Sequence, residues 1–109
     1  MTTPARTAEQ RTDALAGALA VRRERARLRQ ALKAREISGV DVLEGADDNA
    51  VWAGLKVIWL LECLPGVGAV RADRFLSAVD IARSRRVQGL GVRQRAALIA
   101  ELTRRGRHE

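Results

Sequence analysis

Leu64-Pro65-Gly66-Val67-Gly68 decides the fold, because this stretch ends one helical pattern and begins another. Pro65 has no backbone N–H and cannot continue the helix before it. Gly66 and Gly68 permit a positive φ or a close backbone approach that a side chain would block. A new helix then begins near Ala69, and its first N–H groups and the positive end of its dipole face outward. The stretch therefore predicts a turn that can bind phosphate through the backbone.

The charge of the chain is high and unevenly divided. Lys and Arg number 20 against 13 for Asp and Glu, and the net charge of +7 favours a polyanionic partner. Residues 1–35 carry nine basic and three acidic groups, residues 36–62 carry one and six, and residues 63–109 carry ten and four. Two basic regions on either side of an acidic one predict two contact surfaces in a single domain of 109 residues.

Apolar periodicity predicts an all-α fold, since no sustained period-two run indicates a strand. We expect a basic N-terminal helix in residues 1–36, of which the first six residues are mobile, and a compact domain of short helices in residues 37–109. Within that domain, helices are expected over 39–44, 51–63 and about 69–79, and from 92 onward. The N-terminal helix should begin at a capping box in Thr7-Ala8-Glu9-Gln10.

Cap signals and apolar faces refine these helices. Ser38 can cap the helix over 39–44 and Gly45 can end it, while Asp48 or Asn49 can cap the central helix over 51–63. The apolar face of the N-terminal helix consists of Val21, Leu28 and Leu32. The three aromatic residues fall in apolar helical patterns and are interpreted as core, which argues against a stacking platform for single-stranded bases; they are Trp52, Trp59 and Phe75.

A second turn precedes the last helix. Ser84 can cap a single turn through Gln88, Gly89 can end it, and Gly91 can lead into the helix near Val92. At least two of its arginines should face solvent or a ligand, and these are Arg83, Arg85 and Arg86. A solvated charge run is the alternative interpretation of the same residues.

Metal, cofactor and membrane chemistry are not expected. The single Cys63 and single His108 cannot supply the four ligands of a structural zinc site, so Cys63 is interpreted as a core residue and His108 as part of the terminus. No apolar run approaches the roughly 20 residues that span a bilayer, and no secretory signal pattern opens the chain. We expect a cytoplasmic monomer with no cofactor and no small-molecule substrate.

Several blocks of the chain occur together in one known family. They are Glu9-Gln10-Arg11, Arg22-Arg23-Glu24-Arg25-Ala26, Lys56-Val57, Leu60-Leu61-Glu62, Leu64-Pro65-Gly66-Val67-Gly68, Val70-Arg71-Ala72, Ser84-Arg85-Arg86-Val87 and Gly89-Leu90-Gly91. With them the chain resembles the actinobacterial integration host factor family. The resemblance implies a long N-terminal helix followed by a helix-two-turns-helix domain that binds duplex DNA with little sequence preference, bends it and compacts the nucleoid.

Both turns and one helix face supply the candidate DNA-binding residues. Those in the turns are Pro65, Gly66, Val67, Gly68, Arg71, Arg74, Arg83, Ser84, Arg85, Arg86, Gly89 and Gly91. Those of a possible second DNA surface are Arg22, Arg29, Lys33 and Lys56. The chain departs from the family pattern at Ala69, where a lysine is usual, and at Ala53-Gly54, where a Gly-Lys pair is usual, and Arg83 stands at a usually acidic position. Each lost phosphate contact lowers the salt slope by about 0.9, so weaker or redistributed binding is expected.

Three other functions compete with duplex DNA binding. Base-excision enzymes have a similar glycine turn, but those that act as lyases place a lysine where this chain has Val70. The nearby carboxylates are interpreted as structural: Asp73 as the partner of an arginine on its own helix, and Asp80 as the cap of a turn. Structured RNA presents the same phosphates as DNA, so a ribosomal-type RNA-binding protein stays open. A protein-interaction adaptor, in which the arginines meet acidic partners, is the third. Salt-sensitive binding to random duplex DNA separates duplex DNA binding from the adaptor function.

Overall fold

The computed structural model describes residues 8–107, and within them the chain is helical with no strand longer than an isolated bridge. The predictions for residues 1–6, Thr7 and His108 lie outside this range. The elements are α1 (Ala8–Lys33), α2 (Gly39–Gly45), the 3-10 turn η1 (Ala46–Asp48), α3 (Ala50–Ala53), α4 (Val57–Glu62), α5 (Ala69–Ala78), the 3-10 turn η2 (Val87–Gly89) and α6 (Val92–Arg107). No helix in the described part of the chain is long and apolar enough to cross a membrane.

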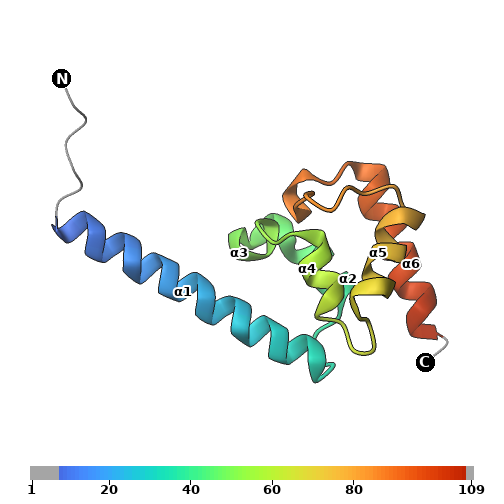
Figure 1. Ribbon diagram of the computed structural model, residues 1–109, viewed down its shortest axis with the longest axis horizontal. Coiled ribbons are helices and arrows are strands. Elements are labelled where there is room, and N and C mark those ends of the chain that lie inside the picture. Colours follow the sequence, from blue (N-terminus) through green and yellow to red (C-terminus); the bar gives the residue numbers. More distant parts are fainter. Residues whose placement is uncertain (1–7, 108–109) are drawn as a thin grey trace.

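One hydrophobic core joins the short helices. Its fully buried side chains come mainly from α2, α4 and the residues beside them, including Leu43, Leu55, Leu60 and Leu61, with Leu98 contributed by α6. Helix α2 packs against α6, and α4 packs against α5. Figure 1 shows these helices gathered in a compact domain, with α1 extending away from it. The predicted all-α architecture is therefore confirmed.

Helix α1 attaches to the domain through its C-terminal half alone. Leu28 and Leu32 are buried, as predicted, whereas Val21 is 37% exposed and was wrongly assigned to the same packed face. The buried residues of α1 are Leu28 and Leu32, so the packed part of this face lies nearer the C-terminal end of the helix than Val21. The helix ends where Arg35 adopts a left-handed conformation (φ 61°) and the N–H of Glu36 donates to the carbonyl of Ala31 at 2.9 Å.

The single helix predicted over 51–63 is wrong, because the chain leaves helical geometry between α3 and α4. Asn49 caps α3 as expected, accepting from the N–H of Trp52 at 3.1 Å. Lys56 is then extended and forms an antiparallel bridge with Arg86, in which Val87 N–H donates to the Leu55 carbonyl at 2.9 Å. Tertiary pairing with a distant loop thus overrides the local helical period.

Two predicted caps have different outcomes. Ser38 forms a full capping box with Asp41 at the start of α2, as predicted. Gly45 is the last residue of α2 but has ordinary helical dihedral angles, so it does not end the helix by adopting a left-handed conformation. A Cβ built at Gly45 would lie 2.8 Å from Cζ3 of Trp52. The glycine is therefore needed for packing, because the Trp52 ring occupies the space of its missing side chain.

Candidate nucleic-acid interface

The glycine turn between α4 and α5 has the conformation that its sequence predicts. Gly66 has a φ of +74°, which a residue with a side chain rarely adopts. The Val67 side chain is buried, and its N–H donates to the Leu64 carbonyl at 3.1 Å. Val67 was expected among the residues that contact DNA, and this is corrected: its apolar side chain anchors the turn to the core.

Gly68 is the N-cap residue of α5 and leaves the N-terminal end of that helix open. It is extended, no side chain caps the helix, and a Cβ built at Gly68 would meet nothing within 4 Å. The first N–H groups of an α-helix have no acceptor within the helix, and Ala69 and Val70 are exposed here. An anion can therefore approach this helix end without steric obstruction from the free protein.

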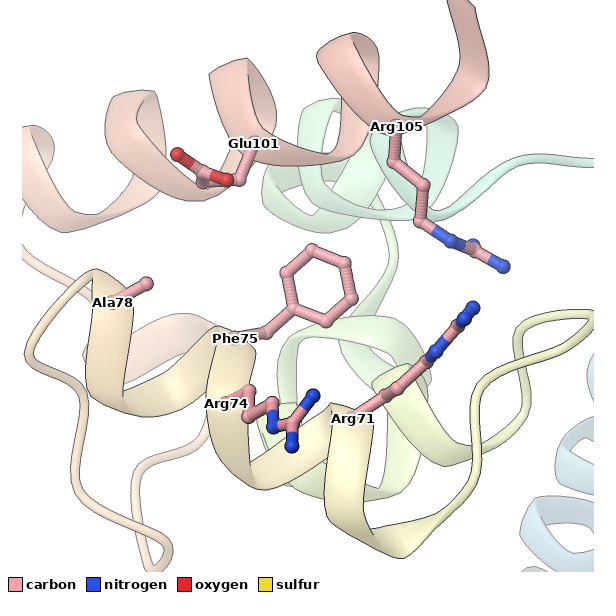
Figure 2. A pocket seen from close by; sticks show the side chains of 6 residues that line it. All are labelled: Arg71, Arg74, Phe75, Ala78, Glu101 and Arg105. Atoms are coloured by element: carbon pink, nitrogen blue, oxygen red, sulfur yellow. The ribbon is translucent and has the colours of Figure 1, made fainter. Parts of the chain in front are cut away.

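A pocket of about 330 Å³ lies between α5 and α6, beside the glycine turn. Figure 2 shows the Phe75 ring at its centre, with the guanidinium groups of Arg71 and Arg105 at one end and Glu101 at the other. Arg105 donates to the Pro65 carbonyl and Arg71 to the Gly66 carbonyl, the latter at 3.4 Å. We call this the arginine pocket; its lining is Arg71, Arg74, Phe75, Ala78, Glu101 and Arg105.

The second turn differs from its prediction in its details. Ser84 does not cap it, because the 3-10 turn begins at Val87. The N-cap position is Arg86, and no side chain forms a cap hydrogen bond there. Gly89 does not end the turn by left-handed geometry either; it leaves room for Arg85, whose Nη1 donates to the Gly89 carbonyl at 3.1 Å. Gly91 does lead into α6, and its N–H donates to Gln94 Oε1 at 3.0 Å.

The arginines of the second turn do not form one cluster. Arg83 is paired with Asp73 of α5, Arg85 folds back on its own turn, and Arg86 donates to the carbonyl of Gly54. The glycine turn and the second turn also lie at opposite ends of α5, whose ten residues span about 15 Å at 1.5 Å per residue. The two turns therefore offer two separate surfaces (Figure 1).

A basic groove runs between α1 and α4, and Trp59 is at its centre. Three adjoining hollows of about 270, 190 and 160 Å³ all include the half-buried side chain of Trp59. Six cations and one carboxylate, Glu62, line them. We call this the Trp59 groove; its cations are Arg22, Arg25, Arg29, Lys33, Lys56 and Arg86. All four residues of the predicted second surface thus lie together, joined by Arg86 from the second turn.

The floor of the Trp59 groove also contains the thiol of Cys63, which is buried as predicted. Burial raises the pKa of this thiol, and the neighbouring Arg29 opposes the rise through a hydrogen bond and its charge. The thiol is therefore neutral near pH 7, and the groove keeps its excess of positive charge.

Comparison with known proteins agrees with this architecture. Residues 32–102 match the family described as S13-like H2TH domain. A Streptomyces coelicolor protein named integration host factor is 46% identical over 101 residues, covering 93% of this chain and 94% of the relative. A Mycobacterium tuberculosis protein of the same name is 44% identical over 99 residues, covering 91% and 94%. The chain belongs to the integration host factor family.

A solved structure of this family shares the fold. It is described as sIHF bound to an 8-base-pair palindromic DNA, and it matches with a TM-score of 0.75 and 44% sequence identity over 79% of this chain and 97% of the other. The helix-two-turns-helix fold predicted from the family resemblance is thereby confirmed for this member of the integration host factor family.

Among the residues that line the two basic surfaces of this family member, sequence reasoning missed Arg25, Trp59 and Arg105. Arg25 could have been found, because it follows Arg22 by three residues and precedes Arg29 by four on the same helix face. Trp59 was assigned to the core, but it and the other two aromatic residues are only half-buried. Arg105 gave no signal, since its partner Pro65 lies 40 residues earlier in the chain.

Proposed function

We propose that this chain binds duplex DNA without enzymatic activity, as a nucleoid-associated architectural protein of the cytoplasm. The relatives named integration host factor and the DNA-bound structure of the same fold support this assignment. The net charge of +7 supports a polyanionic partner. The observation that carries the proposal is the Trp59 groove, where six cations and one carboxylate line three hollows that share Trp59.

The chemistry of the groove favours the DNA backbone over the bases. Arginine and lysine neutralise phosphates and release counterions, which gives affinity that depends little on sequence and strongly on salt. Arginines can also favour narrow A·T-rich minor grooves, through their stronger negative potential. We therefore propose weak sequence preference, with phosphates held by Arg22, Arg25, Arg29, Lys33 and Lys56.

A second contact is proposed at the glycine turn. The open N-terminus of α5 at Gly68, with Arg71 and Arg74 beside it, offers backbone N–H groups and guanidinium groups to phosphate. The Trp59 groove is lined mainly from α1 and α4, the arginine pocket is lined from α5 and α6, and α4 packs against α5. Two such surfaces can hold one bent duplex or two neighbouring duplexes, and either arrangement compacts DNA.

Fluorescence anisotropy with a short random-sequence duplex, over a range of salt concentrations, tests the proposal. The matched variants are Lys56→Ala and Arg27→Ala, because Lys56 lines the groove whereas Arg27 pairs with Glu24 at 2.9 Å and lines a different hollow. Lys56→Ala should weaken binding and reduce the salt slope by about 0.9, while Arg27→Ala should leave the slope unchanged.

Two results contradict the proposal. Failure of the wild type to bind the duplex near physiological salt removes DNA as the partner. Equal effects of the two substitutions remove the groove as the site. A structured RNA added as competitor decides the remaining alternative, since strong competition assigns the groove to RNA.

A further inference from the structure

The two tryptophans of the chain lie in different electrostatic surroundings. Trp59 lines all three hollows of the basic groove. Trp52 lies in a separate hollow of about 340 Å³ whose charged residues are Glu24, Glu36 and Arg27, and its ring packs against Gly45. Trp52 therefore fills space beside α2. Trp59 places part of an aromatic surface where a polyanion is expected to bind.

The guanidinium group of Arg29 already lies over the Trp59 indole. Arg29 is exposed, and its Cζ lies 5.4 Å from the centroid of the Trp59 ring, within the range of a cation–π interaction. Planar guanidinium groups and aromatic rings are the two kinds of surface on which proteins stack splayed-out bases. The pair thus forms a layered platform at the floor of the groove, whereas a lysine at position 29 would provide only a charge.

Cations surround this platform on both sides. Arg22 and Arg25 line it from α1, Lys33 lies one helical turn beyond Arg29, and Lys56 approaches from the start of α4. A basic track that follows the backbone, combined with an aromatic ring for a base, is the arrangement that proteins use for single-stranded nucleic acid. A fully paired duplex cannot use the ring, since its bases are stacked on one another.

From this arrangement we propose that the Trp59–Arg29 platform stacks an unpaired base, so that the chain prefers DNA carrying a bulged or otherwise unpaired nucleotide to intact duplex. This inference rests on the proposed DNA binding and specifies its ligand. The base lies on the platform, and the flanking phosphates lie along the groove cations. Because every base has an aromatic face, the preference depends on the unpaired state of the base rather than on its identity.

The test compares three duplexes of one sequence: intact, with one bulged adenine, and with one bulged abasic residue. The abasic bulge keeps the extra phosphate and the flexibility of the bulged strand but lacks the base. The wild type should bind the adenine bulge about tenfold more tightly than the abasic bulge. In the Trp52→Phe variant Trp59 is the single tryptophan, and the adenine bulge should quench its fluorescence more strongly than the abasic bulge.

Variants separate the platform from general electrostatics. Within each of the variants Trp59→Leu and Arg29→Lys, the affinity for the adenine bulge should fall to that for the abasic bulge, because each substitution removes one layer of the platform. Arg27→Lys, which changes an arginine paired with Glu24 on another face of the same helix, should retain it. Arg29→Lys keeps the proposal testable if Trp59→Leu fails to fold, since Arg29 is exposed.

The possible failures can be told apart. Equal affinity of the wild type for adenine and abasic bulges overturns the stacking platform and leaves duplex binding intact. An adenine preference that survives Arg29→Lys and Trp59→Leu overturns the assigned residues. Absence of binding to all three duplexes overturns the proposed function, and this inference with it.

Discussion

The glycine turn offers two substitutions, only two residues apart, with opposite expected effects on stability. Gly66→Ala places a side chain at a φ of +74° and a Cβ at 3.3 Å from Nη2 of Arg105. Left-handed backbone costs a residue with a side chain about 1–2 kcal/mol, and Arg105 can shift but the backbone strain remains. Gly68→Ala meets no atom within 4 Å and has an ordinary extended backbone. It should stabilise the fold by about 0.4–1 kcal/mol, because alanine restricts the unfolded chain.

Thermal denaturation followed by circular dichroism measures this difference. The two variants should differ by about 1.4–3 kcal/mol, and at about 4–8 °C per kcal/mol Gly66→Ala should melt at least about 6 °C below Gly68→Ala. Gly68→Ala should nevertheless bind duplex DNA less tightly, since its methyl group stands at the open end of α5. Equal melting temperatures, or a lower one for Gly68→Ala, would refute the conformations assigned to this turn.

The remaining predictions concern packing and titration. Gly45→Ala should destabilise the fold by about 1–3 kcal/mol because its Cβ lies 2.8 Å from Trp52; urea denaturation, with a parallel Trp52→Leu background that restores the space, checks this cause. Gly54→Ala should be neutral or stabilising by up to about 1 kcal/mol, since its nearest contact is 3.5 Å and its φ is −83°, and a loss in the same assay would count against it. Burial raises the pKa of the Cys63 thiol, so the folded state holds its proton more tightly and the free energy of unfolding should fall as pH rises above the ordinary thiol pKa. Cys63→Ala should lack that decline, and an identical pH dependence in both proteins would contradict it.

Local chemistry made part of the fold predictable. Pro65 and Gly66 act on their own backbone, so the end of α4 and the start of α5 follow from residues adjacent in sequence. The capping box at Ser38 is equally local. The division between α3 and α4 was not predictable from periodicity, because it depends on the pairing of Lys56 with Arg86, thirty residues away in the chain.

The candidate site was predictable in composition but not in arrangement. The basic stripe on α1 follows from helical spacing. Its position beside Trp59 depends on how α1 packs on the domain, and an apolar pattern does not say which of its members is left half-exposed. The arginines of the second turn show the same limit, because Arg83 and Arg86 find partners in Asp73 and Gly54 that their own sequence context does not reveal.

The central claim is that duplex DNA occupies the Trp59 groove, and the two tryptophans provide an internal comparison. Adding a short random-sequence duplex to isotopically labelled protein at low salt, and recording the two indole N–H signals by nuclear magnetic resonance, tests it most directly. The Trp59 signal should shift in a saturable way that added salt reverses. The Trp52 signal, from the hollow containing Glu24 and Glu36, should stay in place. An unmoved Trp59 signal in a sample that binds the duplex, or a shift confined to Trp52, would contradict the claim.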